Sequence, residues 1–464
     1  MRKLLRGGTV VSGQECKKSD ILIEDGIIIK VAEHIAAEEI GEAGELVEVT
    51  GKLLFPGFID AHTHMDLAVA GTVTADNFST GTKAAVSGGT TLLIDFATQY
   101  KMESLHQALE NWHHKADACS SCDYAFHLAI SDWKEPISEE LKDIIAEGVT
   151  SFKLYMTYDD MVLDDKELYQ VLKRLKVLGG IAGVHCENKG IIEARIAEEK
   201  AAGNLTALAH PFTRPAEAEA EAISRLLKIA ALVDTPIIIV HLSSAAGFRE
   251  VQYARERGQC VILETCPQYL LLDETCYALE NGEALKYVIA PPLRKKEDQE
   301  VLWSALQKNQ IQTLSTDHCS FTLAQKAMGK ADFTKIPGGM PGVETRPVLF
   351  YQYGVLQHHL SLQQMCRLLT ENPAKLYGVY PQKGCIAPGS DADIVVWDPD
   401  CEWVLSVANQ VAHVDYSPFE GQRVHGKAEQ VYLHGELVAR DGAVLVENSG
   451  RYVTRGRGQL DSFK

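Results

Sequence analysis

The sequence predicts a (β/α)₈ barrel of the TIM type joined to a small β-sandwich domain built from both chain ends. Residues 57–380 alternate apolar runs with helical stretches, which is the pattern of parallel strands connected by helices. Short β-type runs lie on both sides of this region, in residues 1–56 and 381–464. We therefore expect two domains, with the barrel inserted between the two halves of the sandwich.

Eight apolar runs account for the strands of the barrel. They are expected at 57–62, 90–96, 124–130, 149–156, 181–185, 236–241, 261–265 and 311–316. A helix is expected at 214–233, where glutamates in the first turns suit the positive end of the helix dipole. In the flanking regions, turn signals such as Asp25-Gly26 separate short β-type runs, which is typical of antiparallel strands.

The last residues of the chain are basic. They carry Arg451, Arg455, Arg457 and Lys464. We expect this tail to contact a neighbouring subunit.

Composition and charge restrict the kind of partner. Of the 464 residues, 46% are hydrophobic and 23% are charged, as in an ordinary globular protein. A formal net charge of −18 opposes binding to nucleic acid or to an anionic membrane, so a small, neutral or weakly polar ligand fits better. No apolar run is long enough to span a bilayer. Because the basic start lacks the apolar core of a signal peptide and eleven cysteines are scattered along the chain, we expect a cytoplasmic protein with reduced thiols.

Two histidines end the first apolar run of the barrel, at His62 and His64. Side chains two positions apart on a strand leave from the same face, so both imidazoles can bind one metal ion. A pair of this kind also occurs at exposed strand ends, and it is only a moderate signal by itself.

Further polar residues lie where other runs stop, which is where barrel enzymes place their active sites. Lys153 lies in the fourth run, His185 and His241 end the fifth and sixth, and Asp317 follows the eighth. Each has an ordinary alternative: a core histidine, a helix N-cap or a lysine that reaches to solvent. Their joint position at one edge of the barrel favours a metal site.

The ligand set predicts two divalent metal ions, of which Zn²⁺ suits imidazole and carboxylate best. Four imidazoles and one carboxylate are more than one open catalytic zinc requires, and a metal pair needs a bridging anion. No acidic residue occupies the fourth-strand position, where Lys153 stands. We therefore hypothesise that Lys153 adds carbon dioxide and becomes N6-carboxylysine, whose carbamate bridges both ions.

This arrangement predicts metal-assisted hydrolysis. Asp317, a metal ligand with a second oxygen, can take the proton of the attacking water and pass it to a leaving nitrogen. Tyr158, five residues past Lys153, can donate a hydrogen bond to the carbonyl oxygen as charge develops there. The alternative for Tyr158 is a partly exposed loop tyrosine.

Six motifs that contain these residues resemble the cyclic amidases of the amidohydrolase superfamily, above all the dihydropyrimidinase and D-hydantoinase group. They are 60–64 (DAHTH), 151–155 (SFKLY), 184–188 (VHCEN), 239–243 (IVHLS), 264–270 (ETCPQYL) and 316–319 (TDHC). Weaker matches continue through nearly the whole chain, at 291–294, 341–344, 389–393 and 415–418.

The resemblance implies a binuclear zinc barrel with a carboxylated lysine, ring-opening of a cyclic ureide to an N-carbamoyl amino acid, and a homotetramer. Its metal ligands fall on His62, His64, Lys153, His185, His241 and Asp317, and its oxyanion tyrosine falls on Tyr158. The family holds the ureide edge through backbone groups at a serine and an asparagine. These positions are Ala290 and Gly338 here, which affects substrate orientation and range more than the reaction.

Residues near the barrel rim predict the substrate. Met65, Leu67, Phe152 and Tyr155 are expected to line a pocket for a hydrophobic ring substituent, which favours 5-substituted hydantoins. Dihydroorotases resemble a pattern with arginine two residues after the second histidine, but this chain has Asp66, which repels an anion. Allantoinases share the ligand set but match the motifs at 151–158 and 415–418 less well. Non-catalytic scaffold relatives have lost ligands, whereas all six ligand positions are filled here.

Overall fold

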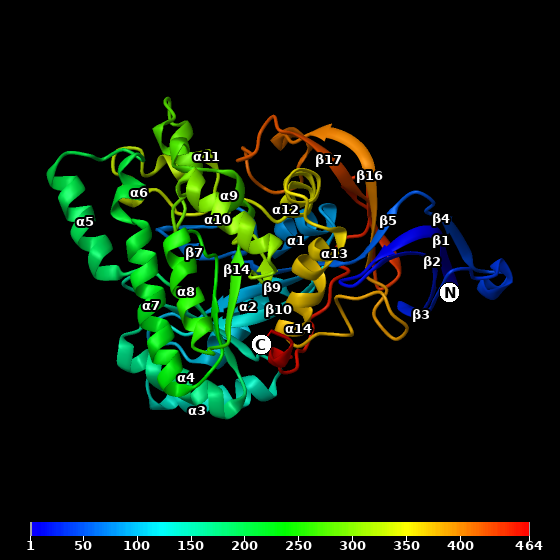
Figure 1. Ribbon diagram of the computed structural model, residues 1–464, viewed down its shortest axis with the longest axis horizontal. Helices are drawn as coiled ribbons and strands as arrows, with labels where there is room; N and C mark the ends of the chain where they lie inside the picture. The colour runs from blue at the N-terminus through cyan, green and yellow to red at the C-terminus, as the bar shows by residue number, and fades with distance from the viewer. Residues whose placement is uncertain (1, 464) are drawn as a thin grey trace.

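The computed structural model describes residues 2–463, and its centre is a parallel eight-stranded sheet curved into a nearly closed barrel (Figure 1). The order β15-β14-β13-β12-β11-β10-β9-β6 follows the chain, so neighbouring strands are joined by single crossovers. The strands are β6 (Phe58–Thr63), β9 (Thr90–Thr98), β10 (Asp123–Ala129), β11 (Ser151–Tyr155), β12 (Ile181–His185), β13 (Ile237–Ile239), β14 (Val261–Thr265) and β15 (Thr313–Leu314). The predicted barrel is confirmed.

Each predicted run overlaps one observed strand, but the fourth, sixth and eighth strands are shorter than predicted and the second is longer. The predicted helix at 214–233 is α7 (Ala216–Val233), with Pro215 as its N-cap residue. Arg214 is excluded because a residue before proline is disfavoured in the α-helical conformation.

Helices surround the barrel and bury one apolar face against it. In α4 (Asp165–Leu178), Leu168, Val171, Leu172 and Leu175 are buried at the spacing of one helical face, and each contributes roughly 1.5–3 kcal/mol. The other α-helices are α1 (Phe78–Ser87), α2 (Leu105–Ala116), α3 (Glu135–Ala146), α5 (Lys189–Ala201), α6 (Ala209–Thr213), α8 (Ala245–Glu256), α9 (Pro267–Leu271), α10 (Lys296–Gln307), α11 (Leu323–Ala327), α12 (Arg346–Leu349), α13 (Leu362–Cys366) and α14 (Asn372–Leu376). Within residues 2–463, no helix has the length and apolarity that crossing a membrane requires.

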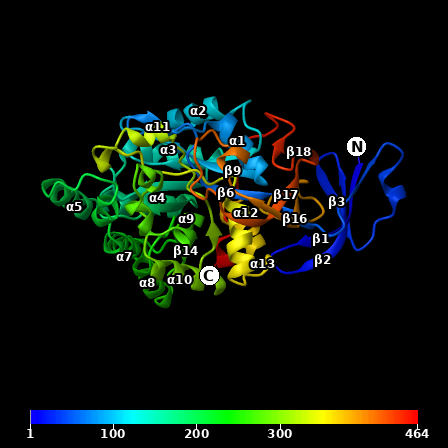
Figure 2. The same cartoon turned by 90° about the horizontal axis from the view of Figure 1, so that it is seen from above.

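A second sheet of nine strands is built from both chain ends, as predicted. Its strands are β1 (Arg2–Val11), β2 (Cys16–Glu24), β3 (Ile27–Ala32), β4 (Glu45–Glu48), β5 (Leu53–Pro56), β16 (Ile394–Val404), β17 (Arg423–Leu433), β18 (Glu436–Arg440) and β19 (Ala443–Val444). Figure 2 shows β1 to β3 at one end of the molecule and α5 at the other. Side chains of both halves share one core cluster, including Ile21 and Ile23 from the first half and Ile394 and Val396 from the second. The domain limits of 1–56 with 381–464, and 57–380, stay a prediction; the first falls between β5 and β6.

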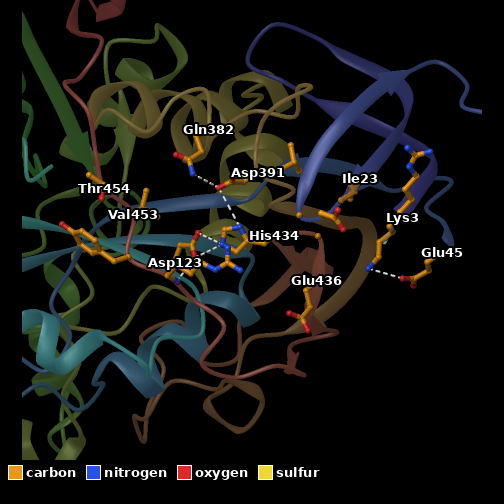
Figure 3. Close-up of a pocket in the computed structure, with 17 residues that line it drawn as sticks. Lys3, Ile23, Glu45, Asp123, Gln382, Asp391, His434, Glu436, Val453 and Thr454 are labelled. Carbon is orange, nitrogen blue, oxygen red and sulfur yellow. Dashed lines mark hydrogen bonds and ion pairs between the residues drawn. The ribbon is translucent and has the colours of Figure 1, made fainter. Parts of the chain in front are cut away.

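A buried charge cluster lies where this sheet meets the barrel (Figure 3). The ammonium of Lys383 lies 2.8 Å from Asp391 and 2.6 Å from Asp393, both near the start of β16, and it also pairs with Asp123 at the start of β10. His434, after β17, lies 3.0 Å from Asp123. Oppositely charged groups from both domains are thereby neutralised against each other.

The basic tail packs on its own barrel, so the expected contact with a neighbouring subunit is wrong for Arg455. Only 3% of Arg455 is exposed, and its guanidinium donates to the hydroxyl of Ser151 (2.7 Å) and to the carbonyl of Phe126. The backbone N–H of Val453 donates to the carbonyl of Tyr124 (2.8 Å). Polar groups of β10 and β11 therefore form hydrogen bonds with the end of the chain. The C-terminus lies beside α14 (Figure 1). Lys464 lies outside the described residues.

The barrel closes across a seam between β6 and β15, which form no ladder with each other among the described residues. Asp60 on β6 accepts hydrogen bonds from the backbone N–H (3.2 Å) and hydroxyl (2.7 Å) of Thr316. The guanidinium of Arg346 donates to the carbonyls of Ile59 (2.8 Å) and Leu314 (2.9 Å), one on each side of the seam. It lies 3.7 Å from Asp60, and both side chains are fully buried. Side chains thus replace the missing backbone ladder.

We expect Arg346→Met to lower the free energy of unfolding by about 3 kcal/mol, because Asp60 and two carbonyls stay buried without their donor. Urea denaturation followed by circular dichroism measures the change. The matched control is Arg423→Met, which removes an exposed ion pair with Glu402 and is expected to cost at most about 1 kcal/mol. Equal stability of Arg346→Met and the wild type would show that this guanidinium does not hold the seam.

Candidate active site

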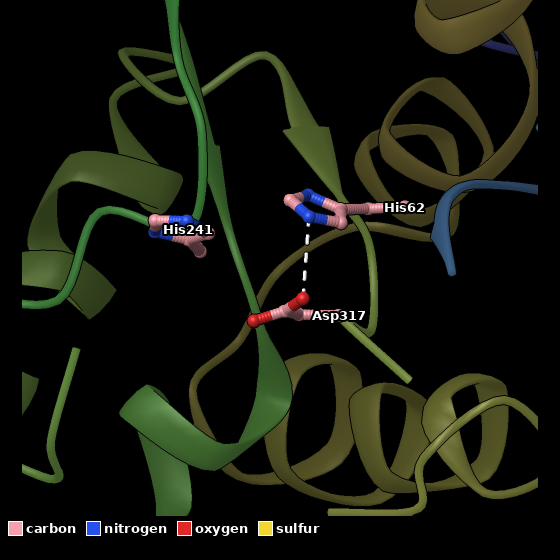
Figure 4. Close-up of side chains that lie close together, drawn as sticks. All are labelled: His62, His241 and Asp317. Carbon is pink, nitrogen blue, oxygen red and sulfur yellow. Dashed lines mark ion pairs between the residues drawn. The ribbon is translucent and has the colours of Figure 1, made fainter. Parts of the chain in front are cut away.

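The structure brings the six predicted ligand residues together at the carboxyl ends of the barrel strands. The Nε2 atom of His62 lies 3.2 Å from the Lys153 Nζ and 3.2 Å from the Asp317 Oδ1. The same Asp317 oxygen lies 3.1 Å from the Nε2 of His64. Candidate ligand atoms of His62, His241 and Asp317 all lie within 4.8 Å of one another (Figure 4).

His185 completes the group from the neighbouring strand. Its ring centroid lies 4.6 Å from that of His241, which lies 5.4 Å from that of His62. The backbone N–H of His64 donates to the carbonyl of His318 (2.8 Å), next to Asp317. The group therefore spans the seam, with residues from its two sides in contact.

Two buried glutamates that the sequence analysis did not assign hold the imidazoles in place. Glu264 on β14 lies 2.6 Å from the Nδ1 of His62, and Glu187 lies 2.7 Å from the Nε2 of His185. Each carboxylate engages one ring nitrogen and so leaves the other for a ligand, which is the usual arrangement around metal-binding histidines. The sequence did contain a signal for both. Glu264 lies inside an apolar strand and Glu187 lies two positions after a strand-terminal histidine, and a carboxylate buried in such a place needs a partner.

Burial keeps most of these side chains close to their neutral forms. It lowers the pKa of His64 to about 4 and the pKa of His241 well below its usual value. It also lowers the pKa of Lys153 to about 8, against the attraction of Asp317 and Glu264. Neutral imidazole is the form that binds metals.

Burial also lowers the pKa of His185, whereas the pKa values of His62 and Asp317 shift towards their charged forms. Burial and the Lys153 ammonium lower the pKa of His62, but Glu264 and Asp317 outweigh them and raise it. For Asp317, burial raises the pKa, but the imidazoles of His62 and His64 hold it well below its usual range. The carboxylate of Asp317 therefore faces the imidazole of His62 at the centre of the group.

Three predicted site residues have backbone angles in the left-handed region. The φ angle is 40° at His241, 53° at Asp317 and 69° at Tyr158. A left-handed conformation of a non-glycine residue costs roughly 1–2 kcal/mol. Each of the three residues lies two or three positions after the last residue of a barrel strand. The chain bends sharply there, so these side chains are redirected at the barrel mouth.

A cavity of about 1130 Å³ opens above the group. Leu67, Tyr155, Tyr158, Ala290 and Gly338 line it, as the sequence analysis expected. It also reaches His64, Lys153, His185, His241 and Asp317. Candidate metal ligands and candidate substrate contacts thus share one cavity.

Met65 and Phe152 do not line this cavity, so their predicted pocket role is wrong. Both lie in the core between the strands and the outer helices, with at most 1% of either residue exposed. Phe152 neighbours Lys153 on β11, and adjacent strand residues point to opposite faces. The Met65 sulphur instead lies against Gly81 of α1.

Tyr158 lies beside the imidazole of His185, with ring centroids 5.2 Å apart. Burial raises its pKa, so the phenol keeps its proton and can donate it in a hydrogen bond. Arg214, which the sequence analysis did not assign, lies 5.5 Å from the centre of the Tyr158 ring and pairs with Glu187. Nothing in the sequence around Arg214, just before α7, indicates this role, because its contacts with Tyr158 and Glu187 form only in the folded protein.

A second group has metal-ligand residue types, namely Asp123, Asp391 and His434. It belongs to the charge cluster between the domains, where Lys383 pairs with both aspartates. The lysine ammonium already supplies the cation there, so we do not include this group in the site.

The sequence from residue 53 to 438 matches the amidohydrolase family. The chain belongs to this family. A D-hydantoinase from Geobacillus stearothermophilus is 42% identical over 461 residues, covering 98% of this amidohydrolase and 97% of the relative. A D-phenylhydantoinase from Escherichia coli is 38% identical over 459 residues, covering 98% of each. The crystal structure of dihydropyrimidinase from Brevibacillus agri NCHU1002 has a TM-score of 0.96 at 43% identity, covering 99% of each chain.

The amidohydrolase family is metal-dependent, and the side chains of this member fit a divalent ion. Imidazole and carboxylate are ligands that zinc and similar ions bind. The Nδ1 atoms of His64 and His241 are buried without a hydrogen-bond partner within residues 2–463, as is the Oε2 of Glu264. Unpaired buried polar atoms are costly, and they mark this region as arranged for a ligand rather than for packing.

We expect Glu264→Gln to weaken zinc affinity about 10–100-fold, because the amide no longer fixes the charge and orientation of His62. Competition with a chromogenic chelator measures the affinity. The control is Glu344→Gln, a carboxylate that accepts from the backbone of Val411 and Ala412 away from the site. Unchanged affinity in Glu264→Gln would show that the glutamate does not support the ligand set.

Proposed function

We propose that this amidohydrolase is a cyclic amidase that hydrolyses the ring amide of hydantoins or dihydropyrimidines to N-carbamoyl amino acids. One observation carries the proposal: five of the six candidate ligands line one cavity and the sixth, His62, lies buried against Lys153 and Asp317, in a chain 42% identical to a D-hydantoinase. The two alternatives, an allantoinase-type ureide hydrolase and a non-catalytic scaffold, have less support. The relatives are named D-hydantoinase, D-phenylhydantoinase and dihydropyrimidinase, and no ligand position is lost.

The proposed ligands of two divalent ions, Zn²⁺ by preference, are His62, His64, Lys153, His185, His241 and Asp317. Bound ions of this kind polarise a carbonyl group and lower the pKa of water towards neutrality. A homotetramer and a cytoplasmic location stay predictions from the sequence.

Lys153 is proposed to carry the bridging anion as N6-carboxylysine. The ammonium would first lose one proton, and the neutral amine would then add to carbon dioxide and release a second proton, which leaves an anion with two oxygens. The surroundings support this step: only 1% of Lys153 is exposed, and its Nζ lies 3.2 Å from His62. A buried ammonium among imidazoles is unfavourable, whereas a carbamate there is attracted by cations.

Two side chains are proposed to act on the substrate itself. Asp317, whose carboxylate is held ionised, accepts a proton at its Oδ atoms and delivers it to the leaving ring nitrogen. The hydroxyl of Tyr158 donates a hydrogen bond to the ring carbonyl oxygen as that oxygen gains charge.

The shape of the cavity supports a substituted ring. Leu67 and Tyr155 supply apolar surface near the ligand residues, where a hydrophobic substituent at the 5-position can be buried. On another wall, Ala290 and Gly338 present backbone with little or no side chain. The amide edge of a cyclic ureide, with alternating donors and acceptors, is proposed to bind there.

We expect a 5-aryl hydantoin or dihydrouracil to have the highest kcat/KM in a panel with allantoin and dihydroorotate. The cavity offers apolar contacts to a substituent. Asp66, which the sequence analysis expected to repel the carboxylate of dihydroorotate, does not line the cavity and lies 4.0 Å from the ammonium of Lys115, so that expectation is wrong. Release of the N-carbamoyl product, followed by chromatography, measures turnover. Preference for dihydroorotate, or no turnover of any ureide by a protein with two bound ions, would refute the proposal.

We expect Lys153→Ala to lower kcat about 10³-fold or more, because several kcal/mol of metal-dependent stabilisation are lost. Millimolar acetate or propionate should restore part of the activity by replacing the carbamate. Lys375→Ala, which removes only an ion pair with Glu371, is the control and should keep full activity. Full activity and metal content in Lys153→Ala would show that this residue is not the bridge.

A further inference from the structure

A lysine that no part of the proposed mechanism uses lies behind the wall of the cavity. Lys326, in α11, is 0% exposed, and within residues 2–463 no carboxylate forms an ion pair with it. Its ammonium donates instead to three backbone carbonyls, those of Val288 (2.8 Å), Pro337 (2.7 Å) and Gly339 (2.6 Å). All three donors of the ammonium are therefore used by main chain.

These carbonyls belong to two segments that form one wall of the cavity, residues 288–290 and 336–340. The segments are far apart in sequence, and one direct backbone hydrogen bond joins them, from the N–H of Gly339 to the carbonyl of Val288 (3.0 Å). Gly339 has a φ of 150°, and a side chain there would meet the carbonyl of Cys319. Lys326 thus adds three contacts to the single backbone hydrogen bond that joins the two segments.

Other donors bind two further carbonyls of the wall. The carbonyl of Ile289 accepts from the Nε2 of His210 (2.7 Å), and the carbonyl of Met340 accepts from the N–H of Cys319 (3.2 Å). Together with the three carbonyls bound by Lys326, five acceptors are turned towards the protein interior and are not available to a ligand.

The main chain of Ala290 and Gly338 differs from these neighbours. Neither residue forms a backbone hydrogen bond among residues 2–463, although both line the cavity. An added Cβ at Gly338 would meet nothing within 4 Å, and Gly338 is exposed while Ala290 is half-buried. Their main-chain groups are therefore open to the cavity, where a ligand can bind them.

We propose that Lys326 is a positioning residue for substrate binding, which holds the two wall segments so that the peptide groups of Ala290 and Gly338 face the amide edge of the cyclic ureide. This inference rests on the proposed function. It explains why a cation is buried where a methionine would fill a similar volume without the desolvation cost. Charge-assisted hydrogen bonds to three carbonyls offset that cost only in this one arrangement of the wall.

The test compares Lys326→Met and Lys326→Gln with the wild type, using 5-phenylhydantoin and the zinc-loaded enzyme. We expect KM to rise about tenfold or more in Lys326→Met. The displaced wall would no longer bind the substrate ring fully, and the free energy of about one hydrogen bond would be lost from binding. Zinc content and kcat should change less than KM, because no ligand or reacting group is altered. Lys326→Gln retains two donors and should have an intermediate KM.

The matched control is Lys383→Met, which removes a lysine that is only 3% exposed from the charge cluster between the domains. It should reduce thermal stability without raising KM. Hydrogen exchange gives a readout independent of turnover: Lys326→Met should accelerate exchange of the Gly339 amide, and Lys383→Met should not.

Three outcomes would overturn the role of Lys326: an unchanged KM in a folded Lys326→Met, equal KM changes in the Lys326 and Lys383 variants, or failure of both Lys326 variants to fold. The last would show that the lysine stabilises the whole fold rather than the wall. If the zinc-loaded wild type hydrolyses no ureide, the proposed function fails instead. Gly339 exchange would then still report whether Lys326 holds the two segments.

Discussion

The buried contact between Asp60, Thr316 and Arg346 is the constraint on which the site depends. Neighbouring barrel strands are held by backbone ladders, but β6 and β15 meet without one. A carboxylate and a guanidinium bind main chain on both sides of this seam, in surroundings where unpaired polar groups are costly. The candidate ligands at the end of β6 and after β15 can approach only because the seam is closed. The chemistry thus depends on interactions that form no part of it.

Three buried lysines of this molecule have different surroundings. Lys383 is neutralised by aspartates between the domains, and Lys326 is held by carbonyls behind the cavity wall. Lys153 has neither arrangement: its Nζ lies 3.2 Å from the imidazole of His62, and no carboxylate among residues 2–463 forms an ion pair with it. A buried amine without a paired carboxylate or converging carbonyls is the one best suited to become an anion itself, which is the basis of the proposed carbamate.

Features that depend on local pattern were predicted well. Each barrel strand was placed within a few residues, because apolar runs between helical stretches leave few alternatives. Residues at strand ends, such as His62 and His185, were singled out by the rule that barrel sites lie at that edge. Errors arose where the direction of a side chain decided the outcome: Phe152 lies next to Lys153 but faces the helices, and Arg455 binds its own barrel.

The sequence by itself determined the barrel, the terminal sheet and the family, since strand periodicity and motif spacing are properties of the linear chain. Only the tertiary structure decided which side chains share the cavity, that Glu264 and Glu187 orient imidazoles, and that Lys326 joins two distant wall segments. The physical reason is that most of these contacts join residues far apart in the chain: 202 positions separate Glu264 from His62, and 38 separate Lys326 from Val288. Their distances are set by barrel curvature and seam closure, which no local pattern encodes.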